Sequence, residues 1–316
     1  MKFSSNIAYN FLKPTIWTVN KLPLDWNKVT NEAKRHKERT ESTSSSISTD
    51  SEDKQKIHHA LPLNSSTNLK DLKLLATISS KNISSEQIAN IILYYLNSFS
   101  SLFVGKTTNY QISELIKKAS KQQKIEIINE IGSDIENIAM NEYGSHPLQV
   151  LIEKASSKEE VRLIINYLTK CKDFVALCKS QQGSFVIQKI ISYFHEKYRN
   201  QLNRLILENI LILSTDMNGV LIVNKYINSC ENKETLSLLT SLFCKNIIFL
   251  SVNKYSNYAI QTLMKKVRSF GNLLSSFYQS IDKNFMPIYG DQYGIHVINT
   301  FSYISLDFKR KHLSND

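Results

Sequence analysis

The stretch Asn141-Glu142-Tyr143-Gly144-Ser145-His146-Pro147-Leu148-Gln149 decides the fold of this chain, because it recurs along the sequence. Other copies begin at Ser180 and Asn253, and weaker ones at Thr107, Asp216 and Asp291. Aligned on the glycine-like position, the copies sit at residues 108, 144, 183, 219, 256 and 294, with steps of 36, 39, 36, 37 and 38 residues. Such a near-constant period is typical of a repeat array in which each unit packs against its neighbours.

Each unit is expected to consist of three helices. Ser133 and Glu136 have the spacing of a capping box and predict a short first helix. Apolar residues at helical spacing from Ser145 predict a second helix, and Pro147 is tolerated in its first turn. A further capping box at Ser157 predicts a third helix with one apolar stripe. The predicted fold class is therefore all-α.

Three variable positions on the second helix have the character of a binding site. Ser145 and Gln149 lie one turn apart on one face, while His146 points roughly 100° away. We call these the edge, amide and ring positions; the other clear copies fill them with Ser184, Phe185 and Gln188, and with Asn257, Tyr258 and Gln261. A polar pair can read the edge of one base while a ring stacks between bases. The pattern predicts binding of an unpaired nucleic-acid strand.

At these residues the chain resembles the Pumilio, or PUF, family of single-strand RNA-binding proteins, over about residues 100 to 305. The resemblance implies a right-handed α-solenoid, a crescent of three-helix repeats that each present one base-reading triplet to an antiparallel RNA. The copy from Asn253 to Met264 resembles the last full repeat of the family. The segment from Asp291 to Phe301 resembles the helical cap that follows it.

The family's code implies a base for the three clear copies. Asn257 with Gln261 would read uracil, and Tyr258 would stack. The serine copies would each read adenine, with Phe185 and His146 stacking; their edge and amide residues are Ser184 with Gln188 and Ser145 with Gln149. The implied core sequence is 5′-U-x-A-A.

Three copies depart from the code. They contain Val220, Leu221 and Asn224; Asn109, Tyr110 and Ser113; and Ile295 and Asn299. In the first, an apolar edge residue leaves the base x unassigned. In the second, Tyr110 can still stack, but a serine replaces the amide, so uracil is expected with weak discrimination. The third agrees with a cap that reads no base, and its ring residue His296 is expected to pack.

Upstream, the array is less regular. A capping box at Ser84 predicts a helix that continues to Leu96, and one or two eroded repeats are expected within residues 65–105. Residues 61–316 form the expected repeat domain. Residues 1–60 differ in composition: Glu41 to Asp53 is rich in serine, and we expect a disordered tail there. Trp17, Leu24 and Trp26 precede it and suit either a partner peptide or packing on the first repeat.

The charge of the chain suits a polyanionic partner. Its 39 Lys and Arg against 28 Asp and Glu give a net charge of +11, and lysines near phosphates supply salt-dependent affinity. Lys189 and Lys225 directly follow the amide position and are candidates for phosphate contacts; ordinary solvated lysines are the alternative.

Other classes of site lack support. The four cysteines show no paired spacing for zinc and are expected to be reduced, buried thiols. They also lack a plausible catalytic partner, so neither an enzyme, a metal nor a cofactor is predicted. No apolar run approaches the ~20 residues of a membrane span.

The sequence therefore predicts a monomeric single-stranded RNA-binding protein. By resemblance, it would act on mRNA 3′ untranslated regions in the cytoplasm and recruit protein effectors for control of translation or decay. One alternative is a PUF-like ribosome-biogenesis factor, nucleolar in location, that binds rRNA with little sequence preference. A second is a helical solenoid that binds proteins and no RNA.

Overall fold

The computed structural model describes residues 74–75, 77–79 and 83–313. The expected serine-rich tail and the cluster of Trp17, Leu24 and Trp26 lie outside these residues. All regular elements in the described part are helices, with no strand. None of these helices has both the length and the apolar character that a membrane crossing requires.

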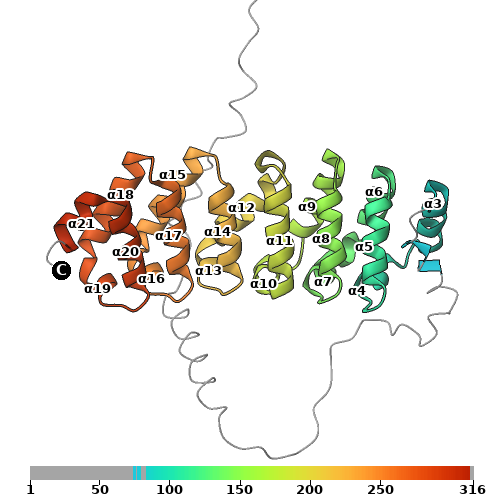
Figure 1. Cartoon of the computed structure of the whole chain (residues 1–316), viewed down its shortest axis with the longest axis horizontal. Coiled ribbons are helices and arrows are strands. Elements are labelled where there is room, and N and C mark those ends of the chain that lie inside the picture. The colour runs from blue at the N-terminus through green and yellow to red at the C-terminus, as the bar shows by residue number, and fades with distance from the viewer. Residues whose placement is uncertain (1–73, 76, 80–82, 314–316) are drawn as a thin grey trace, which may run out of the picture. The chain divides into compact units, whose positions relative to one another are not determined.

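Three kinds of helix alternate along the chain (Figure 1). The first helices are short: α4 (Phe99–Val104), α7 (Ile135–Met140), α10 (Phe174–Lys179), α13 (Ile210–Ser214), α16 (Ile247–Ser251) and α19 (Phe285–Tyr289). The second helices are α5 (Asn109–Lys118), α8 (Ser145–Lys154), α11 (Gln181–Tyr193), α14 (Gly219–Ser229), α17 (Ser256–Val267) and α20 (Gly294–Ile304). The third helices are α3 (Ser85–Tyr94), α6 (Lys121–Ile131), α9 (Lys158–Thr169), α12 (Asn200–Glu208), α15 (Lys233–Lys245), α18 (Gly271–Lys283) and α21 (Leu306–Leu313).

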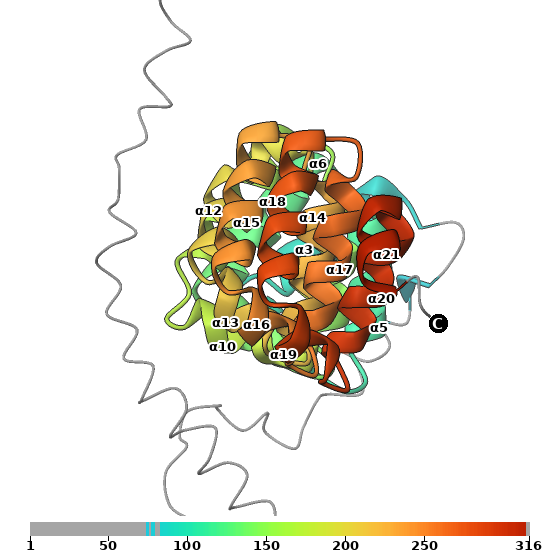
Figure 2. The ribbon, with the colours of Figure 1, turned by 90° about the vertical axis from the view of Figure 1, so that its left-hand side faces the viewer.

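In successive repeats, helices of the same kind pack against each other. Viewed from the end of the array, the third helices α12, α15 and α18 lie apart from the first helices α10, α13, α16 and α19 (Figure 2). Each second helix packs against the second helix of the next repeat, from α5 through to α20. Third helices also pack in sequence, as α6, α9 and α12 and again as α15 and α18. The predicted all-α solenoid of helical repeats is confirmed.

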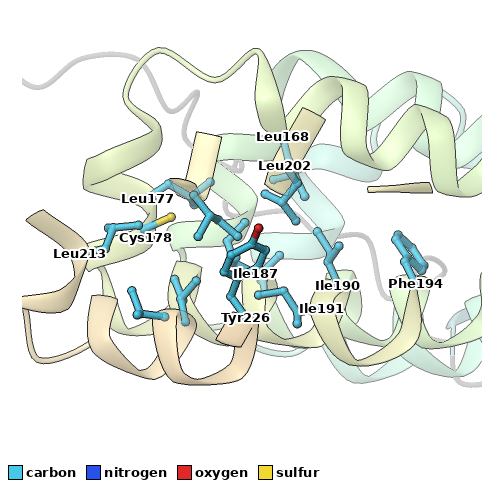
Figure 3. Packing of buried hydrophobic residues seen from close by; sticks show 14 of the residues in the cluster. Leu168, Leu177, Cys178, Ile187, Ile190, Ile191, Phe194, Leu202, Leu213 and Tyr226 are labelled. Carbon is cyan, nitrogen blue, oxygen red and sulfur yellow. The ribbon is translucent and has the colours of Figure 1, made fainter. Parts of the chain in front are cut away.

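The core runs continuously between these helices. In the repeat of α11, Ile187 and Ile190 point inward and pack against residues of the same and neighbouring repeats (Figure 3). Their partners include Leu168, Leu177, Cys178, Leu202, Leu213 and Tyr226. Each repeat thus completes the burial of its apolar faces by stacking on its neighbours, which is why the period of the sequence specifies the fold.

The glycine-like position marks a close approach of two helices. At Gly183, an added Cβ would overlap the carbonyl oxygen of Leu177 in the preceding first helix. Ser256 and Thr108 occupy the same position elsewhere, and their hydroxyls donate to the equivalent first-helix carbonyls over 2.7 Å and 2.6 Å. The site therefore accepts either no side chain or one whose hydroxyl bonds the obstructing oxygen.

The polar residue that opens each phrase also has a structural role. The side-chain oxygen of Asn141 accepts hydrogen bonds from the backbone amides of Tyr143 and Gly144. Asp216, Asn253 and Asp291 do the same in their repeats, and the Ser180 hydroxyl accepts from Gly183. These bonds satisfy amides that the start of the second helix leaves without partners.

Two of the three predicted capping boxes are confirmed, at Ser84 and Ser157. The third, at Ser133, is wrong, because this residue lies in the 3-10 turn η2 (Gly132–Asp134). The Glu136 carboxylate instead accepts from the backbone amides of Lys172 and Asp173 in the next repeat, over 2.9 Å and 3.3 Å. The helix that starts after Ser84 ends at Tyr94, so its predicted continuation to Leu96 is also wrong.

The cysteines differ in burial. Cys178 and Cys230 are buried as predicted, but Cys171 and Cys244 are only half-buried. None forms a disulfide, and burial raises the pKa of both half-buried thiols to about 11. Their thiolate forms are therefore scarce at neutral pH, which makes them poor nucleophiles.

Candidate nucleic-acid interface

The ring positions form an exposed row across successive second helices. Their exposed fractions are 59% for Tyr110, 41% for Phe185, 42% for Leu221 and 57% for Tyr258, and His146 is exposed as well. In every second helix except α5, where Gln111 is half-buried, the next two residues are buried, as Val186 and Ile187 are. Because successive helix positions are about 100° apart, this burial turns the ring position outward.

The row continues into the cap. His296 occupies the ring position of α20 and is exposed, so the expectation that it packs is wrong. The reason is the shared geometry of the second helices, which turns this position outward in the cap as in the other repeats. Neighbouring helices pack about 8–10 Å apart, a spacing that lets a planar base enter between the rings of successive repeats.

The edge positions lie beneath this row. The exposed fraction is 2% for Ser145, 0% for Ser184 and 1% for Asn257. The Ser184 hydroxyl donates to the Gln181 carbonyl over 2.8 Å, and the Ser145 hydroxyl donates to the side-chain oxygen of Gln182 over 3.2 Å. Both serines thus use their hydroxyl hydrogen in a bond within the protein.

The glutamines at the amide positions are half-buried, and both polar atoms of the Gln261 side chain form hydrogen bonds. Gln261 Nε2 donates to Asn257 Oδ1 over 3.0 Å, and Gln261 Oε1 accepts from the Thr300 hydroxyl over 2.8 Å. Asn257 Nδ2 in turn donates to the backbone carbonyls of Asn253 and Lys254, both over 2.9 Å. Sequence reasoning missed Thr300, because it comes from the neighbouring helix α20.

Two other amides have buried atoms without a partner. Gln188 Nε2 and Asn224 Oδ1 are both inaccessible to solvent and form no hydrogen bond in the described part of the chain. A buried polar atom without a partner costs about 1–3 kcal/mol. A ligand that supplies the missing partner would recover this cost, so the two atoms favour an interface that is completed by binding.

The N-terminal copy shares part of this geometry. Asn109 Nδ2 donates to the carbonyls of Gly105 and Lys106, which is the bonding that Asn257 makes in its own repeat. Ser113 is buried, and its hydroxyl donates to the Asn109 carbonyl. The edge residue and the exposed ring of Tyr110 are in place, whereas an amide is lacking.

Lys189 and Lys225, the two candidates for phosphate contacts, differ in whether their charge is already paired. The Lys189 ammonium lies 2.8 Å from Glu153 Oε2 and 4.5 Å from the centre of the Tyr193 ring. Burial opposes its charge, but the hydrogen bond to Glu153 raises the pKa of Lys189 above its ordinary value. Lys225 is exposed and forms neither a hydrogen bond nor an ion pair with the residues that the structure describes. Its charge is the more available for a phosphate.

Comparison with known proteins identifies similar repeats. The model of the Pumilio-family RNA-binding repeat matches residues 134–169, 173–202 and 246–268. Pumilio homolog 12 of Arabidopsis thaliana is 25% identical over 179 residues, which cover 56% of this chain and 29% of the relative. Suppressor protein MPT5 of Saccharomyces cerevisiae is 28% identical over 175 residues, which cover 52% of this chain and 20% of the relative. The chain thus spans less than a third of these curated relatives.

A solved structure also resembles the array. The RNA-binding domain of yeast Puf5p, bound to AAT2 RNA, superimposes with a TM-score of 0.67 at 20% identity. The match covers 78% of this chain and 69% of the yeast chain. At this identity the likeness concerns the fold, an all-α solenoid of helical repeats.

Proposed function

The chain belongs to the Pumilio family of RNA-binding repeat proteins, and from this premise we propose that it binds single-stranded RNA along its second helices. One observation carries the proposal: three repeats, those of His146, Phe185 and Tyr258, place an exposed ring three residues before a half-buried amide. Rings that stack on bases and amides that meet base edges are what recognition of an unpaired strand requires. The RNA-bound state of the Puf5p domain supports the same use of this fold.

We further propose the core 5′-U-x-A-A, read from the C-terminal repeat toward the N-terminus. Asn257 and Gln261 would read uracil with Tyr258 stacked on the base. The adenine-reading pairs would be Ser184 with Gln188 and Ser145 with Gln149, beside the rings of Phe185 and His146. The repeat with Leu221 and Asn224 would hold the base x, and the repeat with Asn109, Tyr110 and Ser113 would take a further uracil with weak discrimination.

The proposed biological role is control of mRNA translation or decay through 3′ untranslated regions, in the cytoplasm, with protein effectors recruited by a monomer. Family membership supports this role. The net charge of +11 suits an RNA partner in general.

Selection from a random pool of short single-stranded RNAs by the full chain, at physiological salt, tests the proposal. We expect enrichment of 5′-U-x-A-A, with loss of binding when Phe185 and Tyr258 are both replaced by alanine. Tight binding without an enriched motif would contradict the base assignments and favour an rRNA-binding role in the nucleolus. Absence of RNA binding would contradict the proposal and leave a protein-binding solenoid.

A further inference from the structure

We propose that Thr300, in helix α20 of the C-terminal cap, is a positioning residue that fixes the amide of Gln261 and thereby sets the preference for uracil over cytosine at the first position of the core. The inference rests on the proposed RNA-binding function. It gives the cap a role in recognition although the cap itself reads no base.

The contacts around Gln261 form one chain of hydrogen bonds. Asn257 gives both hydrogens of its amide to backbone carbonyls, so only its oxygen faces Gln261. That oxygen can accept only from Nε2, which lies 3.0 Å away. Thr300 holds the opposite atom, Gln261 Oε1, over 2.8 Å. Turning this amide over would place Oε1 against Asn257 Oδ1 and break both hydrogen bonds, so Asn257 and Thr300 each contribute to its orientation.

The orientation of the Gln261 amide matters because uracil and cytosine present opposite patterns of hydrogen-bond donors and acceptors. Uracil presents an acceptor at O4 beside a donor at N3, whereas cytosine presents a donor at N4 beside an acceptor at N3. A glutamine amide that can turn over fits either base, because it offers both a donor and an acceptor. The held amide of Gln261 keeps one Nε2 hydrogen and one Oε1 lone pair in a fixed order, so it suits one pyrimidine only.

The other repeats lack this support. The residues that align with Thr300 are Lys225 in the repeat after Gln188 and Lys189 in the repeat after Gln149. Lys189 is paired with Glu153, and neither lysine bonds to an amide in the described chain. Thr262, the aligned residue after Asn224, donates to the Tyr258 carbonyl of its own helix over 2.8 Å. Thr300 is distinct in turning its hydroxyl toward the preceding repeat.

The test compares Thr300→Val with Thr300→Ser in the full chain, and the matched control is Thr262→Val. The measurement is the affinity for short RNAs that carry 5′-U-x-A-A or 5′-C-x-A-A. We expect Thr300→Val to reduce the ratio of uracil to cytosine affinity by about fivefold, the effect of one hydrogen bond of typical net strength. Thr300→Ser keeps the hydroxyl and should retain the ratio, as should Thr262→Val.

The outcomes separate the inference from the function that it rests on. A wild-type chain that prefers uracil together with an unchanged ratio in Thr300→Val would overturn the role of Thr300 and leave RNA binding intact. A wild-type chain that binds neither RNA would overturn both. If Thr300→Val merely weakened the fold, its melting temperature would fall and both RNAs would lose affinity equally, which also counts against the inference.

Discussion

Two ion pairs join neighbouring repeats on different sides of the array, and they have the same length but different surroundings. Lys124 of α6 lies 2.8 Å from Glu160 of α9, with side chains 6% and 0% exposed. Lys189 of α11 lies 2.8 Å from Glu153 of α8, with side chains 25% and 33% exposed. Removing one partner of a buried pair leaves an uncompensated charge, whereas an exposed pair contributes little.

The buried pair lies on the side of the array where contacts between repeats stabilise the fold, whereas the exposed pair lies on the side proposed to bind RNA. On the third-helix side, the Glu160 carboxylate also accepts from the backbone amides of Ser156 and Ser157, and Lys124 also donates to the carbonyl of Lys154. On the second-helix side, the ring positions are exposed, whereas the edge positions beneath them are buried. Residues at the ring positions can therefore change with little effect on the fold.

The largest expected effect is on stability and concerns the buried pair. Lys124→Ala should lower the free energy of unfolding by about 3–5 kcal/mol, because it leaves the Glu160 carboxylate buried and unpaired. Lys189→Ala is the matched control and should cost no more than about 1 kcal/mol. Urea denaturation measures both, and equal losses would show that burial does not distinguish the two pairs.

The buried pair also gives this prediction a pH dependence. Burial opposes ionisation of Glu160, but the ion pair with Lys124 and hydrogen bonds from the backbone amides of Ser156 and Ser157 outweigh it and lower the pKa of the carboxyl. The contribution of the pair is therefore full above the pKa of the unfolded carboxyl, about 4.3. It is lost as the pH falls through the lower folded pKa. At a pH below the folded pKa of Glu160, the free energies of unfolding of wild type and Lys124→Ala should differ less than at neutral pH.

An intermediate effect is expected on specificity, without a change in stability. Gln188→Glu should shift the third base of the core from adenine toward guanine by about 1–3 kcal/mol, because a carboxylate accepts from the N1 and N2 donors of guanine. Competition between 5′-U-x-A-A and 5′-U-x-G-A measures the shift. Gln149→Glu should move the fourth base instead, and an unchanged third base in Gln188→Glu would remove Gln188 from the reading face.

The smallest effect is expected for the free lysine. Lys225→Ala should weaken all RNA sequences about equally and reduce the slope of log affinity against log salt by about 0.7, the value for one phosphate contact on a single strand. Lys189→Ala should change the slope less, because Glu153 already compensates its charge. Titration at several salt concentrations measures both slopes, and a larger change for Lys189 would reverse this assignment.

The sequence predicts most of what depends on local spacing. The period, the three helices of a unit and the capping boxes at Ser84 and Ser157 follow from residues close together in the chain, and the structure agrees. The outward direction of the ring at Phe185 and Tyr258 follows in the same way from helix geometry.

What the sequence could not predict involves contacts between repeats. Glu136 has the right spacing to cap its own helix, yet it bonds to amides 36 and 37 residues further on. Thr300 likewise reaches a glutamine 39 residues earlier. The burial of Ser145 and Ser184 also depends on how closely neighbouring second helices pack. Such contacts depend on the stacking angle and separation of the repeats, which a single phrase does not encode.

The close approach at the glycine-like position has a consequence for engineering. At Gly183, the obstructing oxygen belongs to Leu177, so the two surfaces that must match lie in the same repeat. A graft that begins at the start of a first helix carries both surfaces together, whereas one that begins at the second helix separates them. The repeat unit that keeps both surfaces together when it is transplanted into another array therefore runs from Phe174 to Glu208.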